Sequence, residues 1–225
     1  LAVAVGGGMA QLIENDPHAR GLGPDGDPLQ SAARMARPAG ASVRDAVRSG
    51  QFVSLYLACL ISSFGVFVPF VHLVPYALDH GVPHSSAVLL LGMIGVGSTA
   101  GRFFLGGLAD RFGRRRSLLA MFAGMALALG VWAVATEVWW LAAFAFAFGV
   151  FYGGWVAVLP AVVMDCFGGR NVSGIIGILY TSVAFGTLIG PSAAGFAFDR
   201  SHSYTLPILA GVCANIIAAG ILIGT

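Results

Sequence analysis

Arg102 is the side chain with the clearest chemical potential, because it is the only charged residue in the apolar run from 85 to 108. If this run spans a membrane, Arg102 lies six residues, roughly 9 Å, inside its end. A charge at that depth costs on the order of 2–3 kcal/mol or more and usually marks a functional site. The guanidinium group presents a planar fork that matches a carboxylate with two parallel hydrogen bonds. Arg102 is therefore a candidate for binding an organic anion. Snorkelling of the long side chain to the membrane surface is the alternative.

A second charged cluster follows the same run. Asp110 comes directly after it, four arginines lie between positions 111 and 116, and Asp165 follows another apolar run. An anion at the C-terminus of a helix is disfavoured by about 0.3–1 kcal/mol, so Asp110 needs a compensating partner. The cluster is interpreted either as a set of ion pairs that closes one end of the protein, or as arginines that only fix topology and contact lipid phosphates.

Enzymatic and metal chemistry find no support in the sequence. No Ser-His-Asp set, carboxylate pair or phosphate loop lies where catalysis could use it, so no catalytic residue, cofactor or metal site is predicted. The stretch GVGSTA from Gly95 resembles a dinucleotide fingerprint but lies inside an apolar run with no strand before it. Cys59, Cys166 and Cys213 are far apart, which fits neither a disulfide framework nor a zinc site.

The elements that must position Arg102 and Asp110 follow from composition. The hydrophobic share of the 225 residues is 57%, and ten of the 22 charged residues fall in the first 50 positions. A soluble domain has roughly 45–50% apolar residues even with glycine included. A membrane crossing takes about 20 apolar residues. The apolar runs predict an all-α polytopic membrane protein with spans at 52–78, 85–108, 117–135, 139–163, 172–198 and 204–224.

The residues before the first span divide into two parts. Residues 1–13 are apolar but too short to cross a membrane, and they lack the basic start of a signal peptide, so they are interpreted as the end of a truncated helix. Residues 14–50 are rich in Pro, Gly, Asp, Arg and Ala and predict a flexible hydrophilic linker. Residues 51–225 form the predicted membrane domain.

Arginine placement predicts the orientation of the spans. Every basic residue is an arginine, and if the linker is cytoplasmic, ten of them lie on that side while only Arg200 lies on the other. The positive-inside rule favours this topology. The linker and the loops after 108 and after 163 are therefore expected in the cytoplasm of a multi-pass cell-membrane protein.

Glycine spacing indicates both a repeat and close helix packing. GGLADR ends the second span and GFAFDR the fifth, 89 residues later. Equivalent positions in two three-span groups predict an inverted three-plus-three repeat. Small residues four apart let helices approach closely. Such pairs are Gly97 with Gly101, Gly149 with Gly153 and Gly186 with Gly190.

The segment GGLADRFGRRRSL from Gly106 to Leu118 resembles the loop signature of the major facilitator superfamily. SFGVFVPFVHLVPYA in the first span, with DCFGGRNVSGIIGILYTS and GTLIGPSAAGFAFD around the fifth, resembles its monocarboxylate porter branch. The resemblance implies that this chain is the C-terminal half of a twelve-helix protein. The N-terminal six-helix half is then missing, and residues 1–13 end helix 6.

The resemblance also implies a cytoplasmic gate. In the family the signature aspartate faces the N-terminus of the helix that corresponds here to 172–198, and nearby arginines pair with acids on helix ends, of which Asp165 is the one available here. Such a cluster holds one side closed in one state and breaks in the other. The expected gate residues are Gly106, Asp110, Arg111, Gly113, Arg114, Arg115 and Asp165.

A substrate pocket around Arg102 is the further implication, since the corresponding arginine of monocarboxylate porters binds the substrate anion. By correspondence with the family, Phe70, Val74, Tyr152 and Val156 line the cavity. One turn before Arg102, an aspartate of the animal members that is thought to take part in proton coupling is replaced by Ser98, and the chain contains no lysine. Proton coupling is thus only a family expectation.

These observations predict half of a secondary transporter that binds small monocarboxylates and works by alternating access. Transport of another small solute on the same fold is one alternative. A membrane receptor or scaffold that transports nothing is the other, and it gains nothing from the cost of an arginine inside a span.

Overall fold

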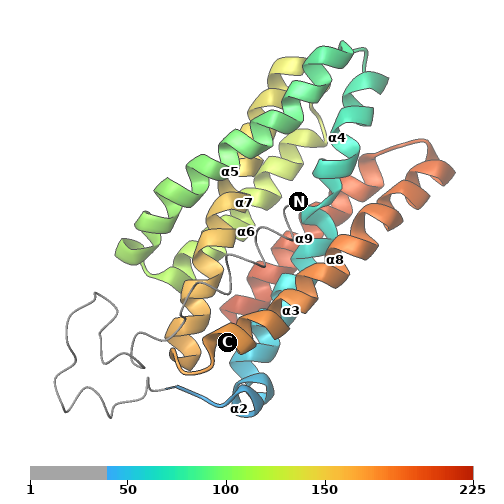
Figure 1. Cartoon of the computed structure of the whole chain (residues 1–225). Helices are drawn as coiled ribbons and strands as arrows, with labels where there is room; N and C mark the ends of the chain where they lie inside the picture. The colour runs from blue at the N-terminus through green and yellow to red at the C-terminus, as the bar shows by residue number, and fades with distance from the viewer. Residues whose placement is uncertain (1–39, 225) are drawn as a thin grey trace, which may run out of the picture. The chain divides into compact units, whose positions relative to one another are not determined.

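A computed structural model of the chain describes residues 40–224, whose regular elements are α-helices (Figure 1). The predicted end of a truncated helix at 1–13 and most of the predicted linker lie outside these residues. The helices are α2 (Val43–Arg48), α3 (Gly50–Val66), α4 (Val68–Asp79), α5 (His84–Phe112), α6 (Arg114–Trp132), α7 (Val138–Phe167), α8 (Val172–Ser201) and α9 (Thr205–Ile223).

Six segments among these residues are long and apolar enough to cross a membrane, with α3 and α4 together making the first of them. The six predicted spans are confirmed, but several of the helices are longer than the apolar runs. The second continues past 108 to Phe112 and the fourth past 163 to Phe167, while the third begins at Arg114 instead of 117. Charged residues end an apolar run without ending a helix, since the backbone hydrogen bonds continue into the interfacial region.

The first span is broken where α3 gives way to α4. Pro69 has no N–H with which to continue the hydrogen-bond ladder. The carbonyl of Gly65 instead accepts from the amide of Phe67, the residue between the two helices. Phe67 and the residues after it are therefore turned relative to α3.

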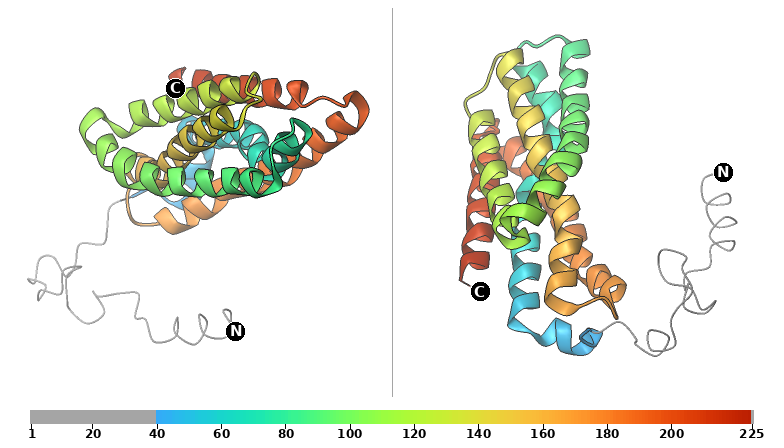
Figure 2. Two further views of the ribbon diagram at one scale, coloured as in Figure 1. Left: turned by 90° about the horizontal axis from the view of Figure 1, so that it is seen from above. Right: turned by 90° about the vertical axis from the view of Figure 1, so that its left-hand side faces the viewer.

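The packing of the helices follows the predicted three-plus-three repeat. The first span packs on α8 and α9 of the second group of three, and α7, which opens the second group, packs on α5 and α6 of the first. The two third members, α6 and α9, contact each other. Figures 1 and 2 show α5, α6 and α7 gathered together and α3, α8 and α9 gathered beside them. The first helix of each group of three thus packs on the second and third helices of the other group, as expected for two inverted groups of three.

Glycines make the close helix crossings that the sequence predicted, and they do so at the repeat distance. A Cβ on Gly101 of α5 would overlap the carbonyl group of Val150 on α7. A Cβ on Gly190 of α8, 89 residues later, would overlap the carbonyl group of Phe64 on α3. The repeat therefore includes the contact surfaces as well as the GxxxDR ends of these helices.

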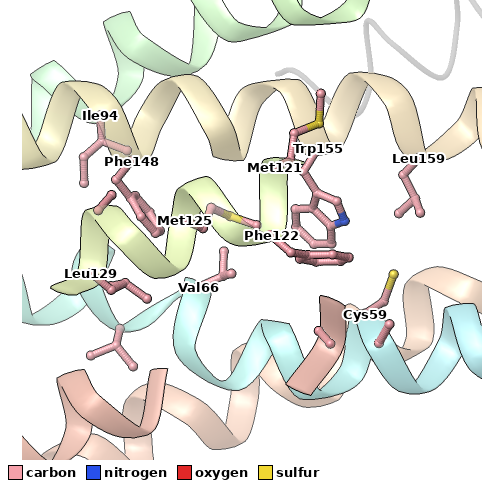
Figure 3. Close-up of a cluster of buried hydrophobic side chains, with 14 of the residues drawn as sticks. Cys59, Val66, Ile94, Met121, Phe122, Met125, Leu129, Phe148, Trp155 and Leu159 are labelled. Carbon is pink, nitrogen blue, oxygen red and sulfur yellow. The ribbon is translucent and has the colours of Figure 1, made fainter. Parts of the chain in front are cut away.

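Large aromatic and sulfur-containing side chains fill the core between α3, α6 and α7. Phe122 of α6 and Trp155 of α7 are buried with ring centroids 6.3 Å apart, and Cys59 of α3 is buried near them (Figure 3). Cys59 thus behaves as a small apolar side chain, while Cys166 and Cys213 are exposed thiols. This core fixes the rotation of α7 about its axis. The rotation in turn sets the direction of the side chains on either side of Trp155 in α7.

The last residues of the predicted linker are helical. Ser42 caps α2 by accepting from the amide of Asp45, and Ala46 is buried. The amide of Ala41 donates to the carbonyl of Phe167 at the end of α7. Composition alone did not predict α2, because this short helix is held in place by a contact with the end of α7, which is distant in the sequence.

Candidate functional site

Arg102 is deeper in its helix than the apolar run indicated. Because α5 continues to Phe112, Arg102 lies ten residues, about 15 Å, from the helix end, where the apolar run gave six residues. Its side chain is exposed within the described part of the chain. It is close enough to the phenols of Tyr152 on α7 and Tyr180 on α8 to act on both electrostatically. The cation and the two phenols come from three different helices, α5, α7 and α8.

Tyr152 joins this polar group to an aromatic cluster. Its ring is edge-on to Phe70, with centroids 5.3 Å apart, and to Phe67, with centroids 6.1 Å apart. Phe70 and Tyr152, two residues expected in the cavity, are thus in contact although they come from different spans. Phe67 was not anticipated, because its direction depends on the break between α3 and α4. The cluster can contact the apolar part of a small ligand.

The other three expected pocket residues are half-buried or buried. Val74 of α4 and Val156 of α7 are half-buried against the core. Ser98 is buried where α5 crosses α7, with backbone atoms that a Cβ on Gly149 or Gly153 would touch. Ser98 therefore belongs mainly to the helix crossing, one turn from Arg102.

Tyr180 is the site residue that sequence reasoning missed. The expected lining was taken from the first, second and fourth spans, whereas Tyr180 lies in the fifth, on α8. Next to it, the hydroxyl of Thr181 lies 3.1 Å from the hydroxyl of Tyr56 on α3. A tyrosine in an apolar span is a weak signal by itself, since most such rings only pack.

Arg114 organises the charged cluster at the other end of α5. Its Nε donates to Oδ1 of Asp110 at 3.1 Å, and its Nη1 donates to Oδ1 of Asp165 at 2.6 Å. One arginine at the start of α6 therefore connects the ends of α5 and α7. Gly113, whose φ of +91° favours glycine, forms the tight link between α5 and α6. Gly106 lies one turn before Asp110 and faces Ala157 of α7.

The ion pairs of Arg114 are accessible to water. The side chains of Asp110 and Asp165 are 64% and 56% exposed, and that of Arg114 is 32% exposed. Exposed pairs of this kind contribute about 0–1 kcal/mol each. In the part of the chain that the structure describes, Asp110 accepts no hydrogen bond from the start of α8. Its compensating partner is Arg114.

The remaining arginines of the loop differ in their contacts. Arg115 donates from Nη2 to the carbonyl of Leu222 at 2.5 Å, near the C-terminus of α9, where a cation is favoured. For Arg111 and Arg116, no hydrogen bond or ion pair occurs among residues 40–224.

Residues 53–224 match the family model described as Major Facilitator Superfamily. The chain belongs to the major facilitator superfamily. It is therefore a multi-pass membrane protein of a transporter family, with six spans that fit one half of the fold.

Relatives of this superfamily member support the narrower resemblance to monocarboxylate porters. It is 36% identical over 159 residues to monocarboxylate transporter 12-B of Danio rerio, which covers 68% of this chain and 33% of the relative. It is 32% identical over 178 residues to monocarboxylate transporter 12 of Homo sapiens, covering 77% and 34%. For monocarboxylate transporter 11 of Mus musculus the identity is 30% over 210 residues, covering 89% and 46%. The chain spans about a third to a half of these relatives.

A histidine inside the first span of this major facilitator protein is a further candidate. His72 lies seven residues before the end of α4, half-buried, with Nε2 3.0 Å from the carbonyl oxygen of Pro191 on α8. Among the described residues, Arg102 and His72 are the only Asp, Glu, Lys, Arg or His side chains that lie more than one turn inside a span. His72 was not among the residues expected in the site, although a lone histidine in an apolar run is visible in the sequence.

The surroundings of His72 contain further polar groups near one end of the bundle. The ring of Tyr204, just before α9, lies 5.8 Å from that of His72. Burial raises the pKa of Tyr204, and the carboxylates of Asp79 and Asp199 raise it further, so its phenol is neutral near pH 7. Tyr76, one turn after His72, donates to the carbonyl of Ala135. His72 thus faces neutral hydroxyl and carbonyl groups.

Proposed function

We propose that this chain forms the C-terminal half of a secondary transporter that moves small monocarboxylates across the cell membrane by alternating access. The observation that carries the proposal is Arg102, a cation about 15 Å inside α5 whose charge acts electrostatically on Tyr152 and Tyr180. A receptor or scaffold would gain nothing from the cost of that charge. The names of the relatives point the same way.

The proposed binding mode uses the two parts of the site separately. The guanidinium group of Arg102 donates two parallel hydrogen bonds to the carboxylate, which replace part of its lost hydration. The edge-on rings of Phe70 and Tyr152 lie against the short apolar part of the substrate. The missing N-terminal half closes the site from the opposite face. No covalent chemistry is involved, so the proposed protein is not an enzyme.

The orientation of the spans is also proposed. Ten arginines of the linker, of the adjoining ends of α5 and α6 and of the loop between α7 and α8 favour the cytoplasm for that side. The cluster of Asp110, Arg114 and Asp165 then lies at the cytoplasmic end and acts as the gate. Weak, exposed ion pairs suit this role, because they can break in each cycle at little cost.

Uptake by the complete protein, restored to its full reading frame and reconstituted in liposomes, tests this function. We expect saturable uptake of a short labelled monocarboxylate and competition by other small monocarboxylates. The corresponding neutral amides should not compete, because they cannot form two charge-assisted hydrogen bonds with Arg102. Equal competition by acids and amides would reassign the protein to another small solute.

The gate makes a prediction of its own. Asp110→Asn in the complete protein should lower the maximal uptake rate by about two- to fivefold, because removing a pair worth up to about 1 kcal/mol shifts the balance of open states. Equilibrium binding of substrate should stay unchanged, since the pocket is intact. Uptake and binding assays on the same preparation measure both. Arg170→Gln, in the next loop on the same side, is the matched control, and equal losses of rate and binding in Asp110→Asn contradict the gate.

His72 is the group that we propose for proton coupling. Its imidazole is the side chain type that gains a proton between about pH 5 and 8. It bonds to α8 from α4 through the carbonyl of Pro191. Nε2 donates to that carbonyl in the imidazolium and in the neutral Nε2–H tautomer, and protonation makes the hydrogen bond charge-assisted. The contact between the two helices is therefore stronger when His72 is protonated, in a protein that lacks the aspartate of its animal relatives.

Replacement of this histidine should separate coupling from binding. We expect His72→Gln to lose accumulation driven by an inward proton gradient, while exchange of labelled for unlabelled substrate continues at a rate within about threefold of the original. His202→Gln, at the end of α8 outside the spans, is the control and should keep both activities. Gradient-driven accumulation that survives in His72→Gln excludes His72 as the proton carrier.

A further inference from the structure

A groove runs between the last turns of α5 and the first turns of α6. It has a volume of about 320 Å³. Arg102 is not among the residues that line the groove, and the polar residues of the groove come from α6, which contributes no residue to the proposed substrate site. The groove is therefore separate from the proposed substrate site. The residues that define it are Leu105, Leu108 and Phe112 of α5, Arg116 and Ser117 of α6 and Phe151 of α7.

The groove combines an apolar wall with a cationic mouth. Leu108 and Phe112 are 44% and 63% exposed, so the wall is open along α5. Arg116 and Ser117 supply the polar groups, at the third and fourth positions of α6, where that span begins. A ligand that fits must therefore carry an apolar chain and an anionic group close to the membrane surface.

Arg116 is free to serve such a ligand. Its neighbours are engaged elsewhere, Arg114 with two carboxylates and Arg115 with the carbonyl of Leu222. Arg116 makes no hydrogen bond or ion pair to any other described residue. Arginine and a hydroxyl group together suit a phosphate, because both donate hydrogen bonds to its oxygens.

We propose that this groove binds a phospholipid with an anionic headgroup. The phosphate lies on Arg116 and Ser117, and one acyl chain follows Leu105, Leu108 and Phe112 toward Phe151. Basic pockets between membrane helices near the headgroup level bind anionic lipids in this way. The bilayer that surrounds the spans supplies the ligand, so no further partner is needed.

A second groove provides an internal comparison. It has a volume of about 280 Å³ and lies between α3, α8 and α9. All of its lining residues are apolar or glycine, among them Phe64, Val68, Gly190 and Leu206. It can therefore hold an acyl chain but cannot distinguish headgroups. We therefore expect headgroup selectivity in the groove that contains Arg116 and none in the groove between α3, α8 and α9.

Native mass spectrometry of the complete protein can measure selectivity. In detergent with equal amounts of phosphatidylglycerol and phosphatidylcholine, we expect at least threefold more retained phosphatidylglycerol. Arg116→Gln should remove this preference without changing retained phosphatidylcholine. Arg111→Gln is the matched control, because Arg111 also has no partner among the described residues but does not line the groove. Equal retention of both lipids by the unaltered protein, or an unchanged preference in Arg116→Gln, overturns the proposal.

Fluorescence quenching can locate the bound lipid. In vesicles of phosphatidylcholine with one fifth phosphatidylglycerol, a tryptophan at Leu108 should be quenched more when the bromine label is on phosphatidylglycerol chains than on the same number of phosphatidylcholine chains. Leu206→Trp, in the apolar groove, should be quenched equally by both. Loss of the difference in Leu108→Trp with Arg116→Gln supports the proposed site. No difference at Leu108, as when another part of the protein covers the groove, contradicts it.

Discussion

Arg102→Ala in the complete protein is expected to reduce monocarboxylate uptake by at least about a hundredfold. Each hydrogen bond between the guanidinium group and the carboxylate contributes about 1.5–3 kcal/mol, so two contribute about 3–6 kcal/mol. Every 1.4 kcal/mol corresponds to a factor of about ten. Initial rates of uptake into liposomes, normalised to inserted protein, measure the loss.

The conservative variant distinguishes charge from geometry. Arg102→Lys keeps the positive charge but loses the planar fork, so uptake should fall by about tenfold, less than in Arg102→Ala. Arg200→Ala is the control, because Arg200 lies over the ring of Phe196 at the opposite end of the spans. Wild-type uptake in both Arg102 variants would mean that Arg102 snorkels to the interface and binds no substrate.

Gly101→Val is expected to prevent normal folding of the membrane domain. A Cβ at Gly101 would overlap backbone atoms of Val150 on α7, and backbone cannot move aside as a flexible side chain does. Overpacking of a tight contact costs about 1–3 kcal/mol or more, and α5 with α7 is the most extensive helix pair among residues 40–224. We expect a fall of about 10 °C in the midpoint of thermal unfolding in detergent, or no monodisperse protein at all.

Substitutions at two other glycines test whether the effect arises from the helix crossing. Gly95→Val lies on the same helix, but no atom lies within 4 Å of a Cβ at that position, so the midpoint should change by less than about 2 °C. Gly190→Val should behave like Gly101→Val, because Gly190 has the equivalent contact with α3 in the other repeat. Size-exclusion profiles after heating measure all three. A stable Gly101→Val with an unstable Gly95→Val would contradict the helix assignment.

Much of the fold is determined by local properties of the sequence. Apolar runs too long to be exposed to water predicted six spans. Two GxxxDR motifs that lie 89 residues apart predicted the repeat. Arg102 also stood out by itself, because a charge in an apolar run is unfavourable wherever the helix packs. The helix ends at Phe112 and Phe167 were missed, since they depend on backbone hydrogen bonds and not on hydropathy.

The neighbours of each side chain were decided only by the tertiary structure. Tyr180 lies within electrostatic reach of Arg102, and Arg114 rather than Arg111 or Arg116 bridges the two carboxylates, because helix rotation and crossing set these directions. Those rotations follow from the contacts of glycines with distant backbone and from the break at Phe67. The sequence by itself determined which residues enter the membrane and which of them carries charge there. Long-range packing decided what that charge can contact, since proximity across helices leaves no local pattern in a chain.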